Sequence, residues 1–329
     1  MWFEKLTGFT EKSPKYVRAH LKIEGNTFVS KANNQRFSFG ELEIASLLQL
    51  KNKSPKLDSY SSAIQVSEIV ADVQELHTSI ENTNALFQAA SQFNLLEMIS
   101  PSITPEQGID RYENDHTQGP VCAITCGAGT IYRNYFVPLD GQLGQTATKQ
   151  IDCLEAIGIA LGNENEKLWK MQNGYALVHP EGLLAINKKI AELSDTERET
   201  LKEKLQVGIQ WNTEVTTSTS RHKVSQIYCS ALPVAYGESE RFYWEYFARL
   251  ILEATYEATL YAALINVEKN KSNVVYFTLV GGGVFGNEDY WILESMQKAI
   301  RKFKKTPLQV RIVSYRASKK MVRDAIQEL

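Results

Sequence analysis

The segment "GGGVFGN" at 281–287 places four glycines where a strand-like stretch, 273–280, gives way to a helical pattern. The spacing Gly281-x-Gly283-x-x-Gly286 matches the dinucleotide-binding motif G-x-G-x-x-G. Glycines let the backbone approach a ligand closely with its N–H groups turned inward, and a following helix N-terminus attracts negative charge. The segment therefore predicts an anion site, with phosphate as the expected occupant. A tight turn that binds no ligand explains the same glycines equally well.

A dinucleotide site is disfavoured by where this segment lies in the chain. The motif normally belongs to the first strand–helix unit of its domain, and a carboxylate about 20 residues later holds a ribose. Here the strand-like stretch 308–315 comes next, and Arg316 stands where the carboxylate is needed. Only that one strand remains, which is too little to complete a dinucleotide fold. A nicotinamide-dependent oxidoreductase is therefore disfavoured.

Four carboxylates between 106 and 115 could support acid–base chemistry. A helix that begins near Glu106 would carry Glu106, Asp110 and Glu113 on one face, with Asp115 well round from them. Such groups act as general acid and general base when their surroundings separate their pKa values. Carboxylates near a helix start more often cap the helix or balance its dipole, so these residues alone do not establish a catalytic role.

Composition limits the class of protein. The chain has 329 residues, of which 43% are hydrophobic and 22% are charged, as in a globular protein with a substantial core. The net charge is −2 with both signs interspersed, so neither a nucleic acid nor a membrane surface is expected as a partner. No apolar run approaches the ~18–20 residues that span a bilayer, and the first residues do not resemble a signal peptide. We expect a cytoplasmic protein, with secretion by a non-classical route left open.

Cysteine and histidine positions predict no metal site. Cys122, Cys126, Cys153 and Cys229 form no C-x-x-C pair, and the five histidines have no ligand spacing. Reduced, buried thiols are the expectation. No cofactor is predicted.

Strand-like and helical patterns alternate along the chain. The expected strands are 28–30, 37–39, 63–73, 84–93, one or two within 120–137, 222–236, 273–280 and 310–315. The expected helices are 149–161, 182–193, 194–205 with Ser194 as N-cap, 240–268, 291–303 and a short one at the end of the chain. This alternation predicts an α/β fold with a sheet covered on both faces. We expect residues 1–60 to be an N-terminal extension packed on a core, 61–329, that carries a helical insert at about 139–222.

Several segments resemble macrodomains and occur in the order of that family. These segments are "VSEIVADV" (66–73), "NALFQAASQFN" (84–94), "GIDRYENDHTQGP" (108–120), "QIYCSALPVAY" (226–236), "GGGVFGN" (281–287) and "VRIVSY" (310–315). The resemblance covers about 63–137 and 223–318. It implies a macrodomain-like, three-layer α/β/α fold with a mixed sheet and a pocket for ADP-ribose.

On this register the resemblance assigns the binding residues. Asp72 would accept a hydrogen bond from the adenine amino group. Ser91 stands where an Asn usually contacts the distal ribose, and Gln92 or Asn94 could substitute for it. The pyrophosphate loop would comprise Gly282, Gly283, Val284, Phe285, Gly286 and Asn287. The usual glycine-rich first loop is replaced by 95–107.

More narrowly, the chain resembles the bacterial MavL-type group, which is similar to poly(ADP-ribose) glycohydrolases. The segments "LTGFTEKSPKYVR", "LFQAASQFNLLEM", "TQGPVCAI", "TIYRNYFV" and "NGYALV" carry this resemblance. It implies a hydrolase that cleaves an N-glycosidic ADP-ribosyl bond to arginine on a modified protein, with ubiquitin as one candidate. Asp110 stands where many macrodomain hydrolases keep a catalytic Asp, and Asp115 is the second catalytic candidate. The alternative is a reader that binds ADP-ribose without turnover, favoured by the replaced first loop and by Ser91.

Overall fold

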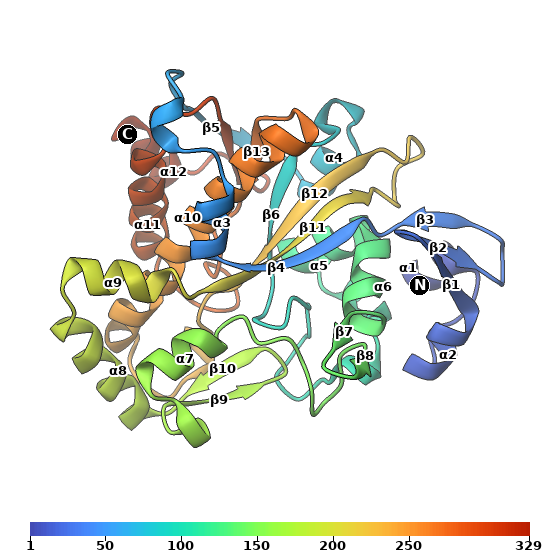
Figure 1. Ribbon diagram of the computed structural model, residues 1–329, viewed down its shortest axis with the longest axis horizontal. Helices are drawn as coiled ribbons and strands as arrows, with labels where there is room; N and C mark the ends of the chain where they lie inside the picture. The colour runs from blue at the N-terminus through green and yellow to red at the C-terminus, as the bar shows by residue number, and fades with distance from the viewer.

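Seven strands form the central sheet of the structure, a computed structural model that describes all 329 residues (Figure 1). In spatial order they are β4 (Glu41–Ser46), β11 (Gln206–Glu214), β12 (Lys223–Cys229), β6 (Leu86–Ala90), β13 (Val274–Phe277), β14 (Gln309–Ser314) and β5 (Gln65–Val70). The strands from β12 to β5 run parallel, whereas β11 is antiparallel to both of its neighbours. The carboxyl ends of the parallel strands therefore lie on one side, and the loops that follow them meet there.

Helices cover both faces of this sheet. One face carries α10 (Glu245–Asn270), and the other carries α4 (Val73–Thr78), α5 (Gln118–Thr125) and α6 (Gly127–Tyr135). Successive residues of β6 show the division, because Gln88 donates a hydrogen bond to Thr259 of α10 and Phe87 stacks on His77 of α4. The expected three-layer α/β/α arrangement around a mixed sheet is confirmed.

The N-terminal residues form a small lobe beside α6 and then enter the central sheet. The lobe contains α1 (Trp2–Thr7), α2 (Pro14–His20), β1 (Leu21–Glu24), β2 (Thr27–Ser30) and β3 (Arg36–Ser38). After β4 comes α3 (Leu47–Lys53), which packs against α10. The aromatic core of the lobe includes Phe28 and Phe39, which pack together and reach the α6 side through Phe136 and Tyr132. The expected extension therefore supplies one strand, β4, to the central sheet, where it pairs with β11.

The middle and the end of the chain supply the other elements. They are β7 (Pro138–Leu139), β8 (Gln142–Leu143), α7 (Glu155–Leu161), β9 (Trp169–Gln172), β10 (Tyr175–Val178), α8 (Pro180–Glu192), α9 (Asp195–Lys202), α11 (Asp289–Lys302) and α12 (Lys320–Gln327). Ser194 caps α9 through a capping box with Glu197, as expected. The other expected helices and strands are found at about their expected positions, apart from the two segments described next. None of the helices has the length and apolarity needed to cross a membrane.

The prediction of strands within 120–137 was wrong, because this segment forms α5 and α6. Pro120 lies in the first turn of α5, where its missing N–H group is not needed. Eight of the nine residues of α6 are buried. A helix enclosed on nearly all sides has no polar face, so its apolar run cannot be distinguished from a buried strand by periodicity.

The prediction of a helix that begins near Glu106 was also wrong. Two short 3₁₀ turns, Pro105–Gln107 and Asp110–Asn114, replace it. Between them Gly108 adopts a left-handed conformation with a φ of 93°, which interrupts any helix. The carboxylates of this segment consequently do not share one helical face.

A buried histidine connects the sheet with α4. His77 stacks on Phe87 with ring centroids 3.7 Å apart. Its Nδ1 lies 2.7 Å from the Val73 carbonyl oxygen, and its Nε2 lies 3.0 Å from Nε2 of Gln226. A neutral ring that donates from Nδ1 and accepts at Nε2 satisfies both contacts. Burial lowers the pKa of His77 from 6.5 to about 4, because a charged ring would lose its hydration there.

We predict that His77 makes the protein less stable in mild acid. Its folded pKa lies below its unfolded pKa, so the unfolded chain binds the proton more tightly, and stability falls as pH drops from about 6.5 toward 4. The full effect is roughly 3 kcal/mol in the free energy of unfolding. Urea unfolding of the wild type and of His77→Phe at pH 7.5 and pH 4.5 measures it. The variant should lose less stability between the two pH values; an equal loss in both proteins would contradict the assignment.

Candidate active site

A cleft lies at the carboxyl ends of the parallel strands, where ligands bind in open α/β sheets. Its walls are the segments that follow β5, β6, β12, β13 and β14, together with the start of α5. The cleft has two chambers that share the wall residues Thr117, Gln118, Thr278, Leu279 and Gly283. Because these lining residues are shared, the two chambers lie next to each other.

The chambers differ in their charged groups. The first, which we call the carboxylate chamber, contains Glu97 and Asp115 as its only charged residues. The second, which we call the Asp72 chamber, has a volume of about 380 Å³ and contains Asp72, His116, Asp289 and Lys319. That volume alone falls in the range of small-molecule sites.

The glycine segment after β13 forms the wall between the chambers and presents free backbone donors. The N–H groups of Gly283, Val284 and Phe285 have no acceptor within the protein. The turn is closed on itself by bonds from Gly282 to Leu279, from Gly286 to Gly283 and from Asn287 to Gly281. Three successive N–H groups without an acceptor in the protein are therefore available to an anion.

The start of α5 faces the same space. The N–H groups of Gln118 and Gly119 have no backbone acceptor, and Pro120 has no N–H group. The Gln118 side chain anchors this end to β6 by accepting from the Ala90 N–H and donating to the Gln88 carbonyl oxygen, each at 2.8 Å. A second set of backbone donors, with the positive end of a helix behind it, therefore lines the cleft.

Glu97 is the most unusual group in the carboxylate chamber. Its side chain is 5% exposed, and its Oε1 atom has no hydrogen-bond partner. Burial raises the pKa of Glu97 well above its ordinary value, the charge of Arg133 opposes this rise, and the charge of Asp115 adds to it. Burial therefore favours the protonated form of this carboxyl group, from which it can donate a proton.

The backbone turn that carries Glu97 is rigid. The Gln92 side chain bridges it, because Oε1 accepts from the Met98 N–H at 2.7 Å and Nε2 donates to the Met98 carbonyl oxygen at 3.2 Å. The Glu97 N–H donates to the Tyr112 hydroxyl at 2.9 Å, and the Tyr175 hydroxyl donates to the Met98 carbonyl oxygen at 2.6 Å. These contacts fix the backbone at Glu97 and Met98, so the Glu97 carboxyl group has a defined position.

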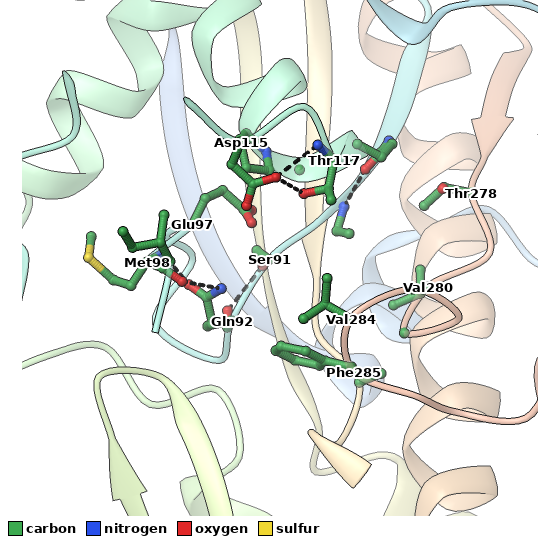
Figure 2. Close-up of a pocket in the computed structure, with 18 of the residues that line it drawn as sticks. Ser91, Gln92, Glu97, Met98, Asp115, Thr117, Thr278, Val280, Val284 and Phe285 are labelled. Atoms are coloured by element: carbon green, nitrogen blue, oxygen red, sulfur yellow. Dashed lines mark hydrogen bonds between the residues drawn. The ribbon is translucent and has the colours of Figure 1, made fainter. Parts of the chain in front are cut away.

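Asp115 lies near Glu97 and has different partners. Its Oδ1 atom accepts from the N–H group and from the hydroxyl of Thr117, at 2.9 and 2.7 Å. These donors stabilise a carboxylate. Figure 2 shows Glu97 and Asp115 on one side of the pocket, with Val284 and Phe285 across from them. A buried neutral acid thus stands beside a hydrogen-bonded carboxylate, which is the arrangement used for general acid–base catalysis.

Three aromatic rings form the far wall of the carboxylate chamber. Tyr175 of β10 and Tyr236 have ring centroids 5.3 Å apart, and Phe285 lies 5.4 Å from Tyr175 and 5.9 Å from Tyr236. Such rings pack against the apolar face of a sugar, and they also attract a cation. Tyr175 comes from the expected insert, so this segment contributes directly to the cleft.

The sequence-predicted residues take several positions. Ser91, Gln92, Gly283, Val284 and Phe285 line the carboxylate chamber, whereas Asp72 and Gly282 line the second chamber beside Gly283. Three residues lie outside both chambers: Asn94, Gly286 and Asn287. Asn94 is fully buried and bonded to Gln150, and Asn287 donates to the Leu232 carbonyl oxygen, so both support loops.

The two predicted catalytic carboxylates are separated. Asp115 lines the carboxylate chamber, but Asp110 does not line the cleft. Asp110 is buried beside the start of α1, where the Phe3 N–H faces its carboxyl group and burial raises its pKa. Its neighbour Glu113 accepts from the Trp2 N–H at 2.8 Å. Asp110 and Glu113 therefore face the start of α1 rather than the cleft.

Sequence analysis missed Glu97 and placed Arg133 differently. Glu97 stands alone in the apolar stretch "FNLLEMI", directly after the strand 84–93, and that isolation was the only available signal. Arg133 belongs to the segment 120–137, for which strands were predicted. It lies within α6, 1% exposed, and does not line either chamber.

Comparison with known proteins gives weak structural similarities. No protein-family model and no curated protein matches the chain. A crystal structure of the poly(ADP-ribose) glycohydrolase from Thermomonospora curvata, bound to the inhibitor ADP-HPD, is 9% identical with a TM-score of 0.45, covering 95% of each chain. The poly(ADP-ribose) glycohydrolase from Deinococcus radiodurans in complex with ADP-ribose is 8% identical with a TM-score of 0.42, covering 88% of this chain and 93% of that chain. Similarities at this level assign no activity, so the function is argued from the cleft.

We predict that Gly119 is required for the position of Glu97. A Cβ atom at 119 would lie 2.4 Å from Oε2 of Glu97 and 2.4 Å from the Ala90 carbonyl oxygen. Gly119→Ala should therefore lower the free energy of unfolding by roughly 1–3 kcal/mol. Gly283→Ala is the matched control, because a Cβ atom there meets nothing within 4 Å. Urea unfolding of both variants measures the difference; equal stabilities would show that the Glu97 turn is not tightly packed.

Proposed function

We propose that this protein is an ADP-ribosyl hydrolase that removes ADP-ribose from a modified protein. The observation that carries the proposal is the buried, unpartnered carboxyl group of Glu97 beside Asp115, in a cleft that continues past a set of free backbone N–H groups. This is an acid–base pair next to an anion site. The macrodomain resemblance of the sequence supports the same conclusion.

ADP-ribose would occupy both chambers. The pyrophosphate would accept from the N–H groups of Gly283, Val284 and Phe285 and lie near the start of α5, where the N–H groups of Gln118 and Gly119 also have no backbone acceptor. The adenosine would enter the Asp72 chamber, where Tyr315 is exposed and available to stack on a base. The distal ribose would then lie in the carboxylate chamber with its C1′ atom toward Glu97 and Asp115.

The chemical step follows from the two carboxyl groups. The bond between C1′ and the leaving nitrogen breaks, and Glu97 donates its proton to that nitrogen. Water adds to C1′ and gives a proton to Asp115, so the products are free ADP-ribose and the unmodified side chain. Proton exchange with solvent then returns both carboxyl groups to their starting states.

We further propose arginine as the modified residue. The carboxylate chamber has no Lys or Arg, and its charged groups are both acidic. A guanidinium group is attracted by the Asp115 carboxylate and by the rings of Tyr175, Tyr236 and Phe285. Arginine-ADP-ribosylated ubiquitin is one candidate substrate, on the strength of the sequence resemblance. We also propose a cytoplasmic location, which suits the four free, buried cysteines.

A reader that only binds ADP-ribose is the second candidate. It is favoured by the turn at 91–98, where most backbone N–H groups already bond within the protein. The N–H groups of Gln92, Leu95 and Leu96 are among these, and they cannot also bind a ligand. A reader, however, has no use for a buried protonated acid, whose burial costs stability.

We predict that Glu97 and Asp115 are needed for turnover but not for binding. Glu97→Gln and Asp115→Asn should each slow ADP-ribose release from ADP-ribosylarginine and from arginine-ADP-ribosylated ubiquitin by about 100-fold or more, because each loses a proton-transfer group. Calorimetry should show ADP-ribose bound with nearly wild-type affinity. Asp110→Asn is the matched control and should retain release, since Asp110 lies outside the cleft.

The outcomes separate the candidates. Binding of ADP-ribose by the wild type without release from either substrate would favour the reader. Absence of binding would refute both. Loss of release in Asp110→Asn with normal release in Glu97→Gln would contradict the assignment of the acid.

A further inference from the structure

Arg133 is a buried cation whose charge no carboxylate neutralises directly. The side chain lies on α6 between the sheet and the Glu97 turn, and no acidic group lies within 4.0 Å of its nitrogens. Its guanidinium stacks on Tyr228 of β12, 3.6 Å from the ring centroid. A buried charge without a counterion is costly and demands an explanation beyond packing.

The hydrogen bonds of Arg133 point to the turn that carries Glu97. Its Nε donates to the Leu95 carbonyl oxygen at 3.0 Å, while its other donors reach Thr130 Oγ1 at 3.0 Å and Gln210 Oε1 at 3.3 Å. Leu95 has a φ of 64°, a left-handed conformation that is strained for leucine. The bond from Arg133 therefore holds a strained residue two positions before Glu97.

The charge of Arg133 also acts on Glu97 itself. Among the groups around Glu97, Arg133 is the one that lowers its pKa and so favours its ionised form. A carboxyl group that donates its proton becomes an anion in a dry site, where a fixed positive charge stabilises it without rearrangement. Without that charge, burial alone would act on Glu97, and its ionised form would be disfavoured further.

We propose that Arg133 is a positioning residue for Glu97, which fixes the 92–98 turn through the Leu95 carbonyl and stabilises the Glu97 carboxylate left by proton transfer. The inference rests on the proposed function for its catalytic meaning. The effect of the Arg133 charge on the proton affinity of Glu97 does not depend on the substrate.

Several other titratable groups face Glu97, and each comes from a different packed element. They are Asp115 before α5, Tyr112 in the 3₁₀ turn Asp110–Asn114, Cys122 of α5, Tyr175 of β10 and Tyr228 of β12. Burial raises the pKa of the tyrosines and of Cys122, so these groups are neutral when Glu97 titrates. Asp115 and Arg133 are therefore the two charges that set the proton affinity of Glu97.

The test uses the full chain and three variants. Arg133→Met removes the charge, Arg133→Lys keeps a charge with fewer hydrogen bonds, and Thr130→Val removes one acceptor of Arg133 without changing charge. Carbon-13 NMR of protein labelled at the glutamate carboxyl carbon, with the Glu97 signal assigned by Glu97→Gln, measures the Glu97 pKa without substrate. Thermal unfolding and ADP-ribose calorimetry identify any variant that fails to fold.

We expect Arg133→Met to raise the Glu97 pKa by about one unit or more, because the opposing charge is gone. Release from ADP-ribosylarginine should lose about tenfold or more in kcat with little change in KM. The kcat for release should decline at high pH, where Glu97 loses its proton, and in Arg133→Met this decline should move to higher pH. In Arg133→Lys the decline in kcat should stay near the wild-type pH. Thr130→Val should lower the stability of the fold without changing the pH of this decline.

The results that overturn the inference differ from those that overturn the function. An unchanged Glu97 pKa in folded Arg133→Met refutes the role of Arg133, whether or not the protein is a hydrolase. Equal shifts of the Glu97 pKa in Arg133→Met and Thr130→Val would show that a loosened 92–98 turn, rather than the lost charge, causes the shift. If Arg133→Met does not fold, Arg133→Lys becomes the deciding variant. A shift of one unit or more in the Glu97 pKa of Arg133→Lys, which keeps the positive charge, would refute charge as the cause. If the wild type releases no ADP-ribose, the hydrolase proposal fails while the NMR measurement still tests Arg133.

Discussion

The cost of burying a carboxyl group at the end of β6 is the constraint on which the site depends. Glu97 has no salt bridge, and burial holds it in the protonated form. Such a group is useful only if its surroundings neither hydrate it nor let it turn away. The Gln92 bridge, the Tyr112 hydroxyl and the β9–β10 hairpin supply that enclosure. The 3₁₀ turn Asp110–Asn114 and the β9–β10 hairpin therefore support the turn that follows β6.

The cleft combines this neutral acid with groups of opposite electrostatic character. Backbone N–H groups of the glycine segment and of α5 suit an anion, whereas Asp115 and the aromatic wall suit a sugar with a cationic leaving group. The fold brings them together because the parallel strands end on one side of the sheet. A ligand with a diphosphate between an adenosine and a second ribose matches this order of groups along the cleft.

Much of the fold could be predicted from the sequence, but less of the site. Strands such as β6 and β14 and the long helix α10 have clear patterns, whereas α5 and α6 are buried on nearly all sides and lack a polar face. The glycine segment was recognisable because glycine itself is the signal. Glu97 was not recognisable, because its proposed role follows from the hydrogen-bond partners that it lacks. Asp110 lies away from the cleft because its segment packs against the start of α1, far from it in the chain. The surroundings of these carboxyl groups are set by contacts between segments that are far apart in the sequence, and residue spacing does not reveal such contacts.

A crystal structure of the Glu97→Gln protein with ADP-ribose would test the proposed binding mode. We expect the pyrophosphate on the N–H groups of Gly283, Val284 and Phe285, the adenine in the Asp72 chamber, and the C1′ atom of the distal ribose facing residues 97 and 115. A nucleotide bound elsewhere, or one whose C1′ atom lies away from both residues, would contradict this binding mode and the proposed roles of Glu97 and Asp115.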